Sequence, residues 1–219
     1  MAIFNVPDNV CFGPDGRGGD FDYGQVRALA LTPQLQIEAL RLRHEAWLVA
    51  QSRVLATTAS SPFPLAVMTC VGMEALGLLA FGSGAKQRDP FLAVAAIMDA
   101  RFAAAVSPTF QSNLAKRWAT TLDSEAKPNS VTTNAELLYF FFRNSLVHGF
   151  RGRGVFLTGD ETQDFVTRDA EGTMILNPWW LWRSYEAAVT AIFNEIVGSS
   201  ASASAKRRAA EDHLKLMLS

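Results

Sequence analysis

The sequence has little cysteine, little histidine and almost no net charge, and each shortage excludes a class of protein. The two cysteines, Cys11 and Cys70, are too few and too far apart for a disulfide framework. Three histidines with no Cys/His cluster at zinc-ligand spacing indicate no metal, and we expect no other cofactor. The 20 Lys and Arg residues against 21 Asp and Glu residues leave a net charge of −1, which excludes a bulk electrostatic binder of nucleic acid or anionic membrane. That total still permits a local basic patch.

The N-terminal residues have neither the basic start nor the apolar run of a signal peptide, and the sparse cysteines fit a reducing compartment. We therefore expect a cytoplasmic protein without a membrane partner. Residues 54–73 carry no charge over a length that can cross a membrane, but Ser60-Ser61-Pro62-Phe63-Pro64 interrupts them. A buried helix is the prediction, and a membrane-associated helical protein is the less favoured alternative. Glu74, the lone charge of this helix, must find a partner or emerge at an edge.

Proline directly after a capping residue marks most of the predicted helix starts, because the missing N–H of proline has no partner at that position anyway. The dipeptides are Thr32-Pro33, Ser61-Pro62, Asp89-Pro90, Ser107-Pro108 and Asn177-Pro178. A sixth start, at Thr133-Asn134-Ala135-Glu136, has the form of a capping box. With the apolar periodicity that follows each start, these signals predict an all-α, up-and-down helical bundle. Its helices are expected over 33–57, 64–82, 90–105, 108–123, 134–148 and 178–197.

Three segments do not fit the helical pattern. Residues 1–31 form a glycine-rich arm that we expect to lie on the surface as a loop. The main helical domain spans 32–198, and within it alternating, glycine-punctuated residues at about 154–176 predict a small β-hairpin insert or a three-stranded excursion before the last main helix. Residues 199–219 are predicted as a Ser/Ala linker and C-terminal tail, in which 206–219 forms a short amphipathic helix.

The three histidines differ in context. His44 lies inside the first predicted helix, where a structural role is favoured over a catalytic one. His213 lies in the tail and is expected to be exposed. His148 ends the run Tyr139-Phe-Phe-Phe-Arg-Asn-Ser-Leu-Val-His148, at the close of an aromatic-rich, capped helix, and is the best candidate for acid–base chemistry.

The segment from Arg143 to His148 resembles the signature of the HEPN family (higher eukaryotes and prokaryotes nucleotide-binding). That signature is Arg, commonly followed by Asn, His or Asp, then a few further residues and then His, near the end of a helix. The pair Arg208 and His213 has the same spacing, but it lies in a charged tail after a linker. Only the first copy has Asn after Arg, a following Gly149, an irregular insert and one further helix, which is the family's layout.

The resemblance implies a small helical domain that acts as a metal-independent endoribonuclease and as a homodimer. One histidine per chain cannot be both general base and general acid, but two protomers supply two histidines to a composite cleft. Arg143 is then expected to stabilise the phosphorane, and Asn144, which shares a helix face with His148, to orient the imidazole or a substrate oxygen. No Asp or Glu occurs over 137–159, so Arg151 and Arg153 are candidates for binding flanking phosphates.

Other interpretations remain open. Arg and His in a last helical turn interact favourably with the helix dipole, so the motif can also be a helix terminus and nothing else. The leading alternative function is a non-catalytic HEPN-like dimer that binds RNA or protein. Trp179, Trp180 and Trp182 are more typical of a core or interface anchor than of base stacking. The resemblance further implies a microbial toxin–antitoxin or antiviral defence setting, with an antitoxin or regulatory protein as partner.

Overall fold

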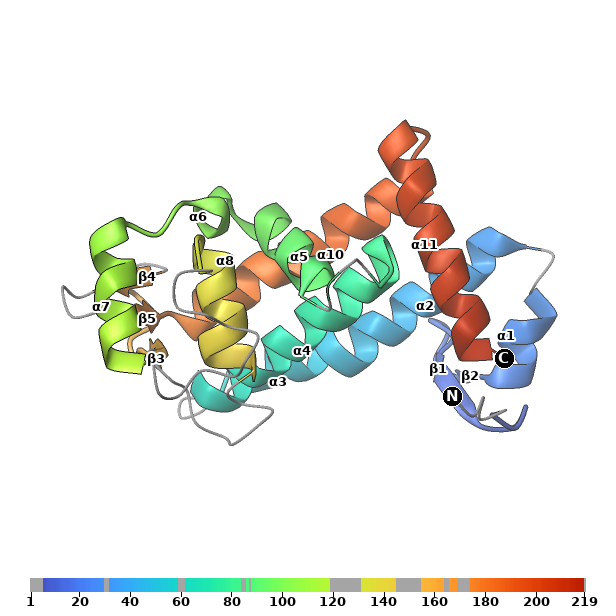
Figure 1. Cartoon of the computed structure of the whole chain (residues 1–219). Helices are drawn as coiled ribbons and strands as arrows, with labels where there is room; N and C mark the ends of the chain where they lie inside the picture. Colours follow the sequence, from blue (N-terminus) through green and yellow to red (C-terminus); the bar gives the residue numbers. More distant parts are fainter. Residues whose placement is uncertain are drawn as a thin grey trace.

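A computed structural model shows an elongated helical molecule, with a two-stranded hairpin at one end and a three-stranded sheet near the other (Figure 1). The structure describes residues 6–29, 32–58, 62–83, 86, 88–118, 131–144, 155–163, 166–168 and 174–218. The predicted all-α class with a small β insert is confirmed.

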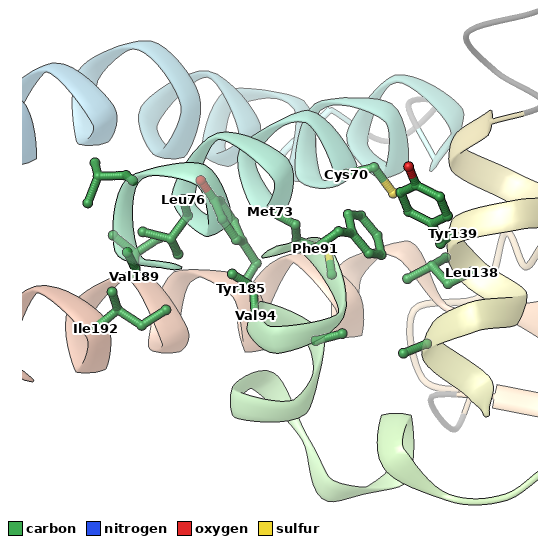
Figure 2. Packing of buried hydrophobic residues seen from close by; sticks show 14 of the residues in the cluster. Cys70, Met73, Leu76, Phe91, Val94, Leu138, Tyr139, Tyr185, Val189 and Ile192 are labelled. Atoms are coloured by element: carbon green, nitrogen blue, oxygen red, sulfur yellow. The ribbon is translucent and has the colours of Figure 1, made fainter. Parts of the chain in front are cut away.

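The core is organised around α4 (Pro62–Phe81), which packs against α3 (Ala50–Ala56), α5 (Asp89–Met98), α10 (Pro178–Val197) and α11 (Ala201–Leu218). Two glycines on α4 allow close approach. A Cβ at Gly72 would lie 2.3 Å from the Tyr185 hydroxyl oxygen on α10, and one at Gly77 would lie 2.5 Å from the Pro90 carbonyl oxygen on α5. Figure 2 shows the side chains that fill the space between these helices, among them Met73, Leu76, Phe91, Val94, Tyr185, Val189 and Ile192.

Helix α4 is the one helix in the described part of the chain that is long and apolar enough to cross a membrane. More than half of this stretch, 56%, is buried inside the protein, as in the core helix of a soluble protein. The prediction of a buried helix in this region is confirmed.

Three of the six predicted capping side chains, Ser107, Thr133 and Asn177, accept a hydrogen bond from a backbone N–H of the helix that follows. Thr32 forms no such hydrogen bond, Asp89 is the first residue of α5 and not its cap, and Ser61 lies outside the described residues. Asn177 accepts hydrogen bonds from the backbone N–H groups of Trp179 and Trp180, and α10 covers the predicted range 178–197. The capping box of Thr133 and Glu136 is formed in both directions. Further helical elements are α2 (Pro33–His44), the π-helical segment η2 (Glu45–Val49), α7 (Pro108–Trp118), α8 (Asn134–Leu137) and the π-helical segment η4 (Leu138–Arg143).

The predicted single helix over 90–105 is wrong, because the helix is interrupted at Asp99. This residue has extended backbone angles (φ −162°, ψ 137°), and α5 ends just before it. Its side chain accepts a hydrogen bond from the backbone N–H of Arg101 and so starts the short helix α6 (Ala100–Ala103). A short carboxylate side chain competes with the helical backbone for its N–H groups, which favours a cap over a continued helix.

The N-terminal arm is also more ordered than predicted. It contains the antiparallel strands β1 (Cys11–Pro14) and β2 (Asp20–Asp22), followed by α1 (Tyr23–Ala28). The side chains of Phe12 and Val26 are fully buried, so the expectation of a surface loop over 1–31 is wrong for the described part of that range. Arg43 on α2 joins the arm to the body: it donates to the Phe12 carbonyl oxygen, and its guanidinium lies 4.8 Å from the centre of the Phe12 ring.

The predicted linker over the Ser/Ala segment is wrong as well, since α11 runs from Ala201 to Leu218. Alanine has the highest helix propensity, and small side chains let this helix lie close to its neighbours. Ala203, Ala210 and Leu214 are buried, and Lys206 forms an ion pair with Glu195 on α10 at 2.9 Å.

The β insert is a mixed three-stranded sheet. Strand β5 (Met174–Leu176) lies in the middle, with β3 (Val155–Leu157) parallel to it and β4 (Val166–Arg168) antiparallel to it. The sheet therefore corresponds to the three-stranded form of the predicted insert.

Candidate functional site

The described residues hold two of the predicted catalytic side chains. Arg143 is the last residue of η4, which continues α8, and Asn144 follows it with helical backbone angles (φ −66°, ψ −38°). His148, Arg151 and Arg153 lie outside the described residues, so the predicted roles of these three stay predictions.

The helix that carries Arg143 is fixed at its start by a capping box and then runs through the core. At its start, the Glu136 carboxylate accepts hydrogen bonds from the backbone N–H of Thr132 at 2.7 Å and from the Thr132 hydroxyl at 2.8 Å. The next turns are buried from Leu138 to Phe142, and the chain first becomes half-buried at Arg143. The turns from Leu138 to Arg143 have π-helical hydrogen bonding, which is frequent at functional sites. Arg143 and Asn144 therefore stand where an apolar helix leaves the core.

Arg143 is held on three sides. Its Nε donates to Oε2 of Glu74 at 2.9 Å, and its Nη2 contacts both oxygens of the same carboxylate. Its Nη1 donates to Oδ1 of Asn144 at 2.8 Å. The guanidinium carbon lies 5.3 Å from the centre of the Tyr139 ring, within the range of a cation–π interaction. Figure 2 shows Tyr139 extending from η4 toward α4. The orientation of the guanidinium is thus well defined.

Glu74 is the site residue that sequence reasoning did not assign. It is the only charged residue of α4, and the requirement for a partner is met by Arg143, 69 positions further along the chain. The side chain of Glu74 is 22% exposed and that of Arg143 is 14% exposed, so the pair lies at the margin of the core and is not sealed inside it. The lone carboxylate on an apolar helix was the available signal, but the sequence does not tell which basic residue forms an ion pair with it.

Asn144 and Cys70 complete the surroundings of the ion pair. The Asn144 side-chain oxygen is used by Arg143, so this contact stands beside the predicted role of orienting an imidazole or a substrate. Cys70 lies one turn before Glu74 on α4 and is buried. Burial raises the pKa of its thiol, and Glu74 adds to this effect while Arg143 opposes it. The thiol is therefore neutral and contributes packing, since a nucleophile would need a thiolate.

Neither of the other two histidines is exposed. His44 is buried, with its Nε2 2.6 Å from the Tyr185 hydroxyl oxygen, and burial lowers its pKa to about 4. Its predicted structural role is confirmed. His213 is half-buried and not exposed as predicted, because α11 packs against the body of the protein. Burial, with a contribution from Arg43, lowers the pKa of His213.

The tryptophans at the start of α10 have mainly packing roles. Trp179 is buried, and its indole N–H donates to the Ala56 carbonyl oxygen at 3.1 Å, which confirms for this residue the predicted anchoring in the core. Trp180 is half-buried and lies under the Arg101 guanidinium at 4.6 Å. Trp182 is also half-buried.

Metal ligands and pockets elsewhere in the described residues do not extend the site. In the part of the chain that the structure describes, no three His, Cys, Asp or Glu side chains gather closely enough to hold a metal ion. A pocket of about 400 Å³ opens between α1, α2 and α11, at the hairpin end of the molecule, and it includes none of the predicted site residues. Its cations are already engaged, since Arg27 donates to the Leu218 carbonyl oxygen and Lys215 pairs with Asp212.

Comparisons with known proteins found no matching family model, no matching curated protein and no matching solved structure. The resemblance to the HEPN family therefore stays a prediction carried by the motif and its context.

Proposed function

We propose that the protein is a HEPN-type, metal-independent endoribonuclease that cleaves RNA through attack of the 2′-hydroxyl at a composite site in a homodimer. The observation that supports this most is the position of Arg143. Its guanidinium is held in a defined orientation where a buried aromatic helix reaches the surface, five residues before His148 in the sequence.

In this proposal each group has a separate task. Two His148 side chains, one from each protomer, act as general base for the 2′-hydroxyl and general acid for the leaving 5′-oxygen. Arg143 donates to the non-bridging oxygens and stabilises the charge that accumulates on the phosphorane. Asn144 holds the guanidinium through Nη1, and Arg151 and Arg153 bind flanking phosphates.

One observation favours the alternative, a non-catalytic HEPN-like dimer that binds RNA or protein. Glu74 pairs with Arg143 through both carboxylate oxygens, and so offsets the charge that a catalytic arginine would present to phosphate. An arginine paired in this way also needs no ligand to balance its charge. The two functions differ in a single property, which is the breaking of an RNA phosphodiester bond.

The experiment is an RNA cleavage assay on structured RNA in excess EDTA. We expect wild-type protein to give products with 2′,3′-cyclic phosphate ends, and His148→Ala and Arg143→Ala to lose this activity. Arg208→Ala is the matched control for the arginine, because Arg208 stands at the same spacing from His213 but lies exposed on α11. Arg143→Lys keeps the charge and loses the two-pronged geometry, and its activity is expected to fall strongly. Equal cleavage by wild type and His148→Ala would contradict the proposal.

The cellular setting follows from the same proposal. A cytoplasmic ribonuclease that acts as a toxin or in antiviral defence needs a neutralising antitoxin or a regulatory protein. Expression in a bacterial host is expected to arrest growth with the wild-type protein and not with His148→Ala. Growth that is equal for the two would argue against a toxin role.

A further inference from the structure

The guanidinium of Arg143 offers one edge that is well suited to a phosphate, and Glu74 occupies it. The edge formed by Nε and Nη2 faces the two oxygens of the Glu74 carboxylate, while Nη1 is directed to Asn144. Carboxylate and phosphate groups bind this edge of arginine with the same paired geometry. The carboxylate therefore has the position that the non-bridging oxygens of an RNA phosphodiester would need.

We propose that Glu74 is a displaceable counter-ion that occupies the phosphate-binding edge of Arg143 until an RNA phosphate replaces it. The proposal rests on the proposed function, in that it takes the ligand of Arg143 to be RNA. Glu74, on α4 and outside the motif, then has a regulatory role. The structure, with the ion pair between Glu74 and Arg143 formed, is the closed state of the site. In that state the pair has no net charge, so Arg143 exerts little attraction on RNA.

The surroundings permit the exchange. Both side chains are partly exposed, 22% for Glu74 and 14% for Arg143, so the carboxylate can turn to water without leaving a charge in the core. Arg143 keeps two other contacts after Glu74 leaves, to the Asn144 oxygen at 2.8 Å and to the Tyr139 ring at 5.3 Å. The guanidinium would thus stay oriented while its partner changes from carboxylate to phosphate.

A purely structural ion pair and a displaceable counter-ion predict opposite changes in RNA affinity when Glu74 is removed. If Glu74 serves only to hold Arg143, its removal loosens the guanidinium and weakens RNA binding. If Glu74 competes with phosphate, its removal strengthens binding. The sign of the change in affinity separates the two.

The test measures binding of a fluorescently labelled single-stranded RNA by anisotropy, in EDTA, with His148→Ala in every protein so that the probe is not cleaved. We expect Glu74→Gln to bind about tenfold more tightly than the parent, which corresponds to about 1.4 kcal/mol. Glu186→Gln is the matched control, since Glu186 also pairs with an arginine, Arg53, and its loss changes the net charge by the same amount. Combining Glu74→Gln with Arg143→Lys is expected to remove the gain.

Glu74→Asp provides a second variant in case the amide disturbs folding, which thermal unfolding reports. It keeps the charge on a shorter side chain, and we expect a smaller gain in affinity. Unchanged or weaker binding by folded Glu74→Gln or Glu74→Asp, or an equal gain in Glu186→Gln, would overturn the proposal.

Cleavage by the same proteins with His148 restored separates the two claims. Tighter binding by Glu74→Gln without cleavage by any protein would leave the counter-ion proposal standing and remove the endoribonuclease. Cleavage that needs His148, together with weaker binding by Glu74→Gln, would do the reverse. An absence of RNA binding by every protein would overturn both.

Discussion

Replacement of Asn177 tests how the β insert is joined to the helical core. This residue is fully buried between the end of β5 and the start of α10. Its side-chain oxygen accepts from the N–H groups of Trp179 and Trp180 at 3.0 and 3.1 Å. Its side-chain nitrogen donates to the carbonyl oxygens of Glu161 and Gln163 at 3.1 and 2.6 Å. One side chain thus caps the helix and fastens the loop that lies between β3 and β4.

The expected cost of Asn177→Ala follows from these contacts. Loss of the helix cap costs about 1 kcal/mol. Loss of the two hydrogen bonds to the carbonyl groups of Glu161 and Gln163 costs about 1 kcal/mol each. The sum is about 3 kcal/mol, which for a chain of this size lowers the midpoint of thermal unfolding by about 6–12 °C.

Asn177→Ser separates the two contributions. Serine is close to alanine in size and still caps the helix, but it is too short to reach Glu161 and Gln163. We expect it to be less destabilised than Asn177→Ala by about 1 kcal/mol in urea titrations followed by circular dichroism. If Asn177→Ala cost less than about 0.5 kcal/mol, within the range of ordinary surface substitutions, the joining role would be refuted.

Two further predictions concern the core. Because burial lowers the pKa of His44 from 6.5 to about 4, the unfolded chain binds a proton that the folded chain does not, and stability falls by about 3 kcal/mol as the pH drops through this range. Urea titrations from pH 7 to pH 4.5 measure most of this loss, about 2 kcal/mol, which should be smaller in His44→Gln, and an unchanged pH dependence in that variant would contradict it. Gly77→Ala should cost about 1–3 kcal/mol, because its Cβ would lie 2.5 Å from the Pro90 carbonyl oxygen and force α4 and α5 apart. Gly159→Ala, which has open space around its Cβ, is the control, and an equal effect of the two substitutions would refute the close-approach argument.

The parts of the fold that were predictable from the sequence are those set by neighbouring residues. Asn177 followed by Pro178 marks the start of α10, and Thr133 with Glu136 marks α8, because each cap is completed within three positions. The break at Asp99 was missed because the apolar pattern continues across it. The first turn of α11, over 201–205, was predicted as a linker because a Ser/Ala composition also occurs in linkers, whereas the rest of the helix corresponds to the amphipathic helix predicted over 206–219. Helices α4 and α10 pack against α11.

In the candidate site, too, the residues of a local motif were predictable and a contact between distant segments was not. Arg143 and Asn144 were found from a local motif, and the structure brings their side chains together. Glu74 was recognised only as a carboxylate in need of a partner, since its pairing with Arg143 joins two helices that are 69 positions apart in the chain. Spacing along one helix carries no information about a contact of this kind.

The central claim is that two His148 side chains, one from each protomer, act together at one RNA-cleaving site. The most direct measurement follows the rate of RNA cleavage by a fixed amount of wild-type protein while His148→Ala protein is added and allowed to exchange subunits. The account predicts that the rate falls toward zero, because each mixed dimer holds a single His148 and lacks either the base or the acid. A rate that stays constant as the variant is added, or a wild-type protein that cleaves no RNA, would contradict it.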